Sequence, residues 1–266
     1  MNMTDAEKIL LSDSIAAAND SRMFEGKTVM ITGASVGIGR GCALLFARQR
    51  ASLALLDINA ETLAALKEEL KPYGVNVFTR VCDISSEQQV RAAVEDAAAQ
   101  LGKIDILVNN AALWRCWAPF LGVSADEWKR FLDVNIMGTV YCTKAVLGGM
   151  VSRGYGRIIN VASVAGVYGN ANMVHYSATK GALIAMTRAL AKEVAACGVT
   201  VNCVSPGSVS PSDQQDIYFT QPSDLSFMGR TGSDAENAAA IVFLAGDGGS
   251  YISGQNIQID GCRKKQ

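Results

Sequence analysis

The sequence predicts an α/β fold: a single-domain, doubly wound parallel sheet of about seven strands with helices on both faces. Short β-branched segments alternate along the chain with longer segments of helical pattern. Most of the short segments are nearly continuous apolar runs, which is typical of parallel strands that helices cover on both sides. The chain has 266 residues, enough to bury the large core that such a sheet requires.

The first two strand–helix units establish this pattern. "KTVMIT" at 27–32 is the first predicted strand, and a glycine-rich turn leads from it into a helix over 37–50. "SLALLD" at 52–57 is the second strand, and Asn59 is a good N-cap for a helix over 59–71. A helix thus joins each strand to the next, which predicts right-handed crossovers.

The middle of the chain repeats the unit twice. We predict strands over 76–81 and 104–109, and helices over 86–101 and 124–152. Two serine pairs fit the starts of these helices: Ser86 with Gln89, and Ser124 with Glu127. In the last part of the chain we predict strands over 156–163, 199–205 and 256–260, with helices over 176–197 and 234–246.

No linker, repeat or low-complexity segment divides the pattern, so we predict one Rossmann-type domain over 23–266. Residues 1–22 precede the first strand as an N-terminal extension. In this extension Thr4 and Glu7 resemble a capping box, which predicts a weak helix. A frayed arm and a subunit contact are both open as its use.

Composition excludes several classes of function. Apolar residues make up 49% of the chain and the net charge is −1, so the chain lacks the basic surface that binds nucleic acid. We expect Arg263, Lys264 and Lys265 to form a short solvated tail. The apolar runs are too short to span a membrane, and no secretory signal is recognisable. Seven scattered cysteines without a CxxC pair, and the single histidine His175, favour free thiols in a reducing cytoplasm and no metal site.

A glycine-rich turn follows the first strand. In "TGASVGIGRG", Gly33, Gly37 and Gly39 permit a tight turn, a close backbone approach to a pyrophosphate, and packing of helix on strand. The start of the next helix supplies free N–H groups for phosphates. We therefore interpret the turn as a dinucleotide cradle.

The same turn also fits a different class of protein. Gly33 to Gly37 reads G-x-S-x-G, the nucleophile elbow of α/β hydrolases, with Ser35 as the nucleophile. That fold needs a histidine later in the chain, and His175 is the sole candidate. The hydrolase stays an alternative of lower weight.

Asp57 indicates which dinucleotide binds. It ends the second strand eighteen residues after Gly39, near the spacing at which a carboxylate binds the ribose hydroxyls. A carboxylate there repels a 2′-phosphate, and the turn offers no cation to attract one. The alternative is that Asp57 caps the helix near Asn59. We predict NAD(H) rather than NADP(H).

A tyrosine and a lysine four residues apart carry the predicted chemistry. In "NMVHYSATKG", Tyr176 and Lys180 share one face of a helix. A cation at roughly 5 Å, at an effective dielectric of about 20, favours phenolate by about 3 kcal/mol. We expect this to lower the tyrosine pKa into the working range of a general acid or base.

At this point the sequence resembles the short-chain dehydrogenase/reductase family from about Gly26 to Gly261. The matching features are "TGASVGIG", Asp57, "CDI" at 82–84, "NNAA" at 109–112, Asn135 in "NIMG", Ser163 in "NVASVAG", "YSATK" and "PG" at 206–207. The resemblance implies that Tyr176 exchanges a proton with the substrate oxygen and that Lys180 binds the nicotinamide ribose. It implies that Ser163 hydrogen-bonds the substrate oxygen and that Asn135 fixes a water that relays protons from Lys180.

The resemblance also implies the cofactor contacts. It places Asp83 and Ile84 around the adenine, Asn109 and Ala111 along the adenosine ribose, and Val209 against the carboxamide. The full expected set is Gly33, Ser35, Val36, Gly37, Ile38, Gly39, Asp57, Ile58, Asp83, Ile84, Asn109, Ala111, Tyr176, Lys180, Pro206, Gly207 and Val209. Two positions depart from the family pattern: Ala112 replaces a glycine, and Pro211 replaces a threonine, so that Ser210 or Ser212 is left to contact the carboxamide.

The expected function is NAD(H)-dependent interconversion of a secondary alcohol and a ketone. Segments 113–120, 164–173 and 211–228 are expected to set the substrate, and their apolar side chains favour a bulky apolar one such as a hydroxysteroid: Trp114, Trp117, Tyr168, Met173, Tyr218, Phe219, Phe227 and Met228. A 3-oxoacyl thioester reductase, a small-alcohol dehydrogenase and a non-catalytic dinucleotide-binding protein remain alternatives. Members of the family commonly form tetramers or dimers through the helices corresponding to 124–152 and 176–197.

Overall fold

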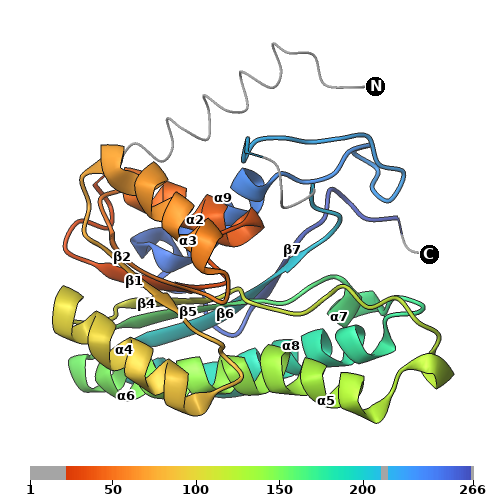
Figure 1. The fold of residues 1–266 in the computed structure, drawn as a ribbon, viewed down its shortest axis with the longest axis horizontal. Coiled ribbons are helices and arrows are strands. Elements are labelled where there is room, and N and C mark those ends of the chain that lie inside the picture. The colour runs from red at the N-terminus through yellow and green to blue at the C-terminus, as the bar shows by residue number, and fades with distance from the viewer. Residues whose placement is uncertain (1–21, 211–214, 265–266) are drawn as a thin grey trace.

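The protein is built on one seven-stranded parallel sheet. A computed structural model describes residues 22–210 and 215–264 (Figure 1). The strand order across the sheet is β3-β2-β1-β4-β5-β6-β7. The strands are β1 (Thr28–Thr32), β2 (Ser52–Asp57), β3 (Val77–Val81), β4 (Ile106–Asn109), β5 (Gly156–Val161), β6 (Val199–Pro206) and β7 (Asn256–Ile259). The predicted doubly wound α/β fold is confirmed.

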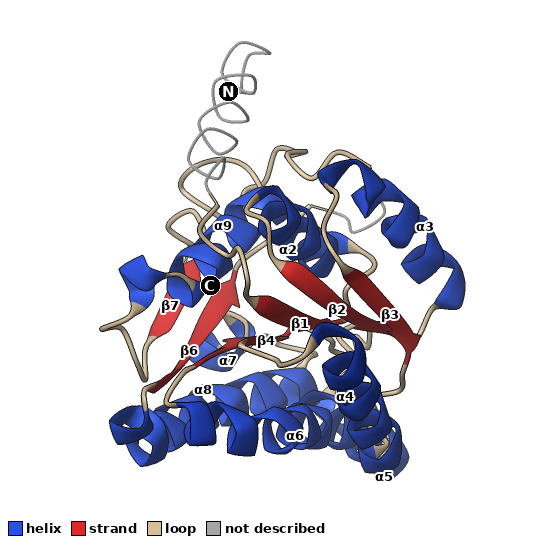
Figure 2. Cartoon of the chain, turned by 90° about the vertical axis from the view of Figure 1, so that its left-hand side faces the viewer, coloured by secondary structure: helices blue, strands red, loops and turns tan. Residues whose placement is uncertain are grey.

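Helices cover both faces of this sheet, and Figures 1 and 2 show the two helical layers. On one face lie α2 (Gly37–Arg48), α3 (Ala60–Leu70) and α9 (Asp234–Ala245). On the other lie α4 (Glu87–Leu101), α5 (Ala125–Leu132), α6 (Gly138–Arg153) and α8 (Val174–Val194), and a short α7 (Ala165–Tyr168) precedes α8. This arrangement explains why most strands read as unbroken apolar runs.

Each helical layer has its own apolar core. One core contains Phe46 of α2, Leu66 of α3 and Ile241 of α9. The other contains Val90 of α4 and Met150 of α6. These side chains are at most 1% exposed. Burying a side chain of this size contributes about 1.5–3 kcal/mol, so the two cores hold the strand ends, and the site built on them, in place.

The strand order reverses at the centre of the sheet. The chain runs outward from β1 through β2 to β3, and then returns to pair β4 with the other side of β1. In open α/β sheets, ligands bind at such a switch point, beyond the carboxyl ends of the strands. The topology therefore predicts where a site should lie.

The structure also bears out the predicted caps. Asn59 accepts hydrogen bonds from the backbone N–H groups of Glu61 and Thr62, and Ser86 and Ser124 cap α4 and α5. Strand and helix boundaries differ from the prediction by one to three residues at most ends. The proposed helix near Thr4 lies outside the described residues.

The helix predicted over 124–152 is not a regular α-helix. A π-helical turn, Asp133–Met137, separates α5 from α6. By length and composition alone, the continuous stretch Ala125–Arg153 could cross a membrane. Cys142 and Met150 of this stretch belong to the apolar core beneath the sheet, and 39% of its most apolar window is buried.

All seven cysteines are free thiols, as predicted. Among the residues that the structure describes, no group of three or more His, Cys, Asp or Glu side chains is arranged to hold a metal ion.

Candidate active site

A cavity of about 1670 Å³ lies at the carboxyl ends of the strands. Residues that follow five different strands line it: Gly33 after β1, Asp57 at the end of β2, Asn110 after β4, Ser163 after β5 and Gly207 after β6. This is the position that the strand order indicates for a ligand. The predicted phosphate cradle and the predicted proton-transfer group share this one cavity.

The glycine turn at one end of the cavity has no room for side chains. Gly33 has φ +60°, and a Cβ there would lie 2.8 Å from the Ala111 Cα. A Cβ on Gly39 would lie 2.0 Å from the Gly33 carbonyl oxygen, so α2 packs directly on the turn. Val36 and Gly37 at the start of α2 line the cavity, where unpaired N–H groups attract phosphate.

Asn110, which the sequence analysis did not select, holds this turn in place. Its side-chain nitrogen donates to the carbonyl oxygens of Thr32 at 3.1 Å and Gly33 at 2.8 Å. The side chain of Asn109, which was selected, lies outside the cavity lining and donates to Asn160 and Thr143. Asn109 is the last residue of β4 and Asn110 is the first residue after it, and their partners show that one asparagine serves the core and the next serves the site.

Asp57 lines the cavity and organises the turn. One carboxylate oxygen accepts the Ser35 N–H at 2.9 Å and the Ser35 hydroxyl at 2.7 Å, while the other accepts the Asn59 N–H at 3.0 Å. Each carboxylate oxygen can accept more than one hydrogen bond, so these contacts leave acceptor capacity for ribose hydroxyls. Ser35 itself is 4% exposed and acts as a support for Asp57.

We expect Asp57→Ala to reduce the preference for NADH over NADPH by at least about tenfold, because it removes the charge that repels a 2′-phosphate. The measurement is the ratio of the two dissociation constants by fluorescence titration. Asp57→Asn is the matched control for geometry, because an amide still accepts the Ser35 N–H. If neither variant changes the ratio, Asp57 does not select the cofactor.

Tyr176, Lys180 and Ser163 lie together on the cavity wall. Tyr176 and Lys180 share a face of α8, with the Lys180 Nζ 5.8 Å from the centre of the phenol ring. Lys180 is 2% exposed, and its Nζ donates to the Val161 carbonyl oxygen at 2.6 Å. The Ser163 hydroxyl oxygen accepts the Ala165 N–H at 3.1 Å, which leaves the hydroxyl proton free to donate.

The sequence predicts a lowered pKa for Tyr176, and this direction is wrong for the protein without a bound cofactor. Burial raises the pKa of Tyr176 above its ordinary value, and hydrogen bonding with Ser163 offsets only part of this rise. Burial also lowers the pKa of Lys180 to about 7, so this lysine carries much less than a full charge at neutral pH. The helical spacing is right, but desolvation is the largest cause of the shift in both residues.

Asn135 lies behind the cavity wall. It is 1% exposed, and its side-chain oxygen accepts the Leu113 N–H at 2.7 Å. Its side-chain nitrogen donates to the Leu113 carbonyl oxygen at 3.0 Å and to the Thr179 hydroxyl at 3.1 Å. The backbone carbonyl oxygen of Asn135 accepts a hydrogen bond from the Thr139 hydroxyl across the π turn. Asn135 therefore fixes the loop after β4 against α8, one residue before Lys180.

The site does not support the hydrolase alternative. The Ser35 hydroxyl is bonded to a carboxylate rather than to an imidazole. His175 is fully buried and packs edge-on against Phe131 and Trp128, at ring-centre distances of 4.3 and 5.9 Å. No nucleophile–base pair forms between these residues.

The substrate end of the cavity is only partly as predicted. Of the eight apolar side chains expected there, four line the cavity: Trp114, Trp117, Tyr168 and Met173. Phe227 and Met228 point outward, with 73% and 66% of their surface exposed. The Tyr218 hydroxyl accepts a hydrogen bond from Arg48 instead.

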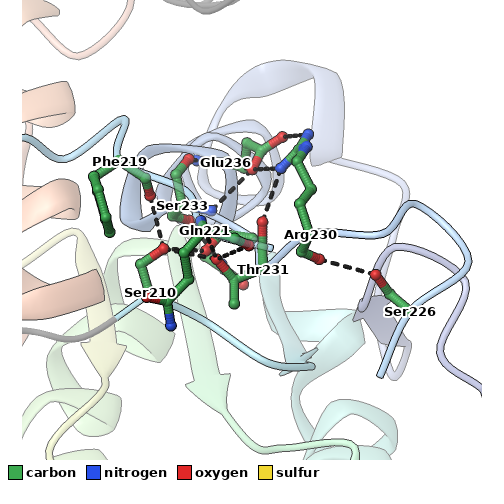
Figure 3. Close-up of polar contacts among 10 residues, drawn as sticks. Ser210, Phe219, Gln221, Ser226, Arg230, Thr231, Ser233 and Glu236 are labelled. Carbon is green, nitrogen blue, oxygen red and sulfur yellow. Dashed lines mark hydrogen bonds and ion pairs between the residues drawn. The ribbon is translucent and has the colours of Figure 1, made fainter. Parts of the chain in front are cut away.

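The segment between β6 and α9 is held by its own polar contacts, which Figure 3 shows. The Ser210 hydroxyl donates to the Phe219 carbonyl oxygen at 2.8 Å and also meets the Thr231 hydroxyl at 2.8 Å. Arg230 forms a two-pronged ion pair with Glu236. Ser210 lines the cavity, but its hydroxyl is engaged within the segment, so its expected contact with a carboxamide stays a prediction. Pro211 and Ser212 lie outside the described residues.

The C-terminal tail also differs from the expectation that it is solvated. Arg263 is half-buried and lines the cavity, and its Nη2 donates to Oδ1 of Asn170 at 3.3 Å. Lys264 lies over the Phe227 ring, 5.6 Å from its centre. No local sequence pattern indicates this placement, because the contact joins residues 93 positions apart.

Comparison with known proteins decides the family. The sequence profile described as short chain dehydrogenase matches residues 27–221. The chain belongs to the short-chain dehydrogenase/reductase family. It is 37% identical over 240 residues to a 3-oxoacyl-[acyl-carrier-protein] reductase of Thermotoga maritima, covering 89% of this chain and 97% of that protein.

Two other members of the short-chain dehydrogenase/reductase family bear on the cofactor. A 2-dehydro-3-deoxy-L-rhamnonate dehydrogenase (NAD(+)) of a Sphingomonas species is 34% identical, covering 90% of this chain and 96% of that protein. A crystal structure of NAD+-bound xylitol dehydrogenase matches with a TM-score of 0.82 and 34% identity, covering 90% of this chain and 99% of that chain. This short-chain dehydrogenase/reductase is an NAD-dependent oxidoreductase acting on CH–OH groups, and its crowded glycine turn and its Asp57 carboxylate fit that dinucleotide.

Proposed function

We propose that this enzyme interconverts a secondary alcohol and a ketone, with Tyr176 as the group that exchanges a proton with the substrate oxygen. The observation that carries the proposal is that Tyr176, Ser163 and Lys180 line the same cavity as the glycine turn and Asp57. A dinucleotide held at the turn would share this space with a substrate at Tyr176.

Each residue of the group has a distinct task in ketone reduction. A nicotinamide held in this cavity would supply the hydride. Because burial raises its pKa, Tyr176 is protonated at neutral pH and can donate its proton to the developing alkoxide. The Ser163 hydroxyl, whose oxygen accepts the Ala165 N–H, can donate its proton to the same substrate oxygen and stabilise its charge.

Lys180 and Asn135 support this proton transfer. Lys180 binds the nicotinamide ribose and, with a pKa near 7, can take up or release a proton at neutral pH. Asn135 fixes a water that relays protons from Lys180 to solvent. Its bond to Thr179, the neighbour of Lys180 on α8, supports this role.

For the substrate, we propose a bulky molecule with a largely apolar body, of which a hydroxysteroid is one class. Trp114, Trp117, Tyr168 and Met173 on the cavity wall support this choice. Reduction of a 3-oxoacyl thioester is the second candidate, and its support is the 37% identity to the Thermotoga maritima reductase.

Titration with NADH and NADPH, followed by a screen of steroid ketones and 3-oxoacyl thioesters for loss of NADH absorbance, tests the proposal. We expect tighter binding of NADH and turnover with at least one ketone class. Binding of NADH without turnover of any ketone would instead favour a non-catalytic dinucleotide-binding protein.

We also propose a cytoplasmic homo-oligomer, a tetramer or a dimer, built from one domain over 23–266 and associating through α5, α6 and α8. Leu132, Met137 and Val151 support this association, because they are exposed apolar side chains on the α5–α6 stretch, with 36–44% of their surface accessible. Light scattering behind size-exclusion chromatography gives the number of subunits, and a monomer at micromolar concentration would contradict the proposal.

A further inference from the structure

Arg263 is a cation in the cavity wall that the proposed reaction does not use. Among the described residues, the Arg263 guanidinium hydrogen-bonds the neutral amide of Asn170 alone, and no carboxylate lies within ion-pair distance of it. Other cations of the lining are already neutralised, since Lys129 pairs with Asp133 and Arg130 with Glu127. A half-buried guanidinium with free donors attracts an anion.

Backbone hydrogen bonds hold Arg263 firmly in this position. The C-terminal segment pairs with the segment before α9: the Phe227 N–H bonds the Cys262 carbonyl, the Met228 N–H bonds that of Gly261, and the Lys264 N–H bonds that of Leu225. The backbone that carries Arg263 is therefore held in place, so only the side chain itself has to be ordered when it binds a ligand.

Asn170 links Arg263 to the proton-transfer group. The Asn170 N–H donates to the hydroxyl of Ser177 at 3.1 Å, and Ser177 follows Tyr176 on α8. The position of the guanidinium is therefore coupled to the turn of helix that carries the phenol. A substrate whose carbonyl lies at Tyr176 can extend toward Arg263.

We propose that Arg263, assisted by Asn170, binds a carboxylate at the end of the substrate remote from its carbonyl group. The inference rests on the proposed function, and it specifies that the substrate carries a negative charge. A carboxylate is favoured over a phosphate because its single charge and two oxygens match one guanidinium fork. The remaining exposed cation of the lining, Arg115, lies over the Trp114 ring instead.

The test uses straight-chain methyl ketones that end in a carboxylic acid, with chains of different length, each paired with its methyl ester. Binding to the enzyme with NADH is measured by calorimetry, and turnover by NADH absorbance. We expect the wild type to bind the acid of the best-fitting length on the order of 10- to 100-fold more tightly than its ester. Arg263→Gln should abolish this preference, and Arg263→Lys should keep part of it.

Lys264→Gln is the matched control, because it removes one positive charge from the same tail at a side chain outside the cavity lining. It should retain the preference for the acid. The inference is overturned if the wild type binds acids and esters equally, if Arg115→Gln rather than Arg263→Gln removes the preference, or if Arg263→Gln weakens NADH binding to the same extent. The inference is supported if Arg263→Gln loses the preference for the acid over the ester and still turns over the ester. Absence of turnover by the wild type with every ketone contradicts the proposed function alone.

Discussion

Replacing Tyr176 by phenylalanine is expected to reduce turnover by about 10³-fold while NADH affinity stays within about twofold of the wild type. The variant removes only the hydroxyl, so the packing of the ring on the cavity wall is kept. General acid–base catalysis contributes typically 10²- to 10⁴-fold, and a phenol that keeps its proton at neutral pH is the donor that ketone reduction needs. Steady-state turnover and fluorescence titration give the two quantities.

Tyr251→Phe is the control for this experiment, because Tyr251 is fully exposed. It should leave both quantities unchanged. Turnover by Tyr176→Phe at the wild-type rate would show that another group transfers the proton.

Replacing Lys180 by methionine is expected to remove turnover and, at the same time, to stabilise the protein in the absence of cofactor. Lowering the pKa of a lysine from 10.5 to about 7 means that folding disfavours its charged form by a few kcal/mol. Methionine has a similar length without a charge. The Val161 carbonyl then loses its donor, which offsets about 1–3 kcal/mol of the gain.

The pH dependence separates this charge effect from a change in packing. Between pH 7 and 10.5 the unfolded chain binds a proton at Lys180 that the folded chain does not, so wild-type stability rises with pH across this range. The advantage of Lys180→Met should therefore be largest below pH 7 and shrink as the pH rises toward 10.5. An advantage that does not change with pH, measured by denaturant unfolding, would contradict the assigned shift.

The strand and helix pattern was predictable because it depends on local spacing. Continuous apolar runs indicate buried parallel strands, and the caps Asn59, Ser86 and Ser124 mark helix starts where the structure has them. The π turn at Asp133–Met137 was not predictable, because its residues differ little in helix propensity from their neighbours.

The residues of the site also fall into those that local spacing predicts and those that it does not. The glycine turn, Asp57 and the pair Tyr176 and Lys180 could be selected because each motif lies within one strand–helix turn or one turn of helix, where backbone geometry sets which side chains meet. The choice between Asn109 and Asn110 was harder, because both lie at the end of the same strand and only the packing of Asn160 and Thr143 shows which one faces the core.

By itself, the sequence determined the doubly wound fold, the position of the dinucleotide turn and the helical spacing of the proton-transfer pair. Only the tertiary structure decided the sign of the Tyr176 pKa shift and the place of Arg263 in the cavity. The physical reason is that desolvation and contacts such as that between Arg263 and Asn170 depend on which distant segments pack together. A pattern within one segment carries no information about that packing.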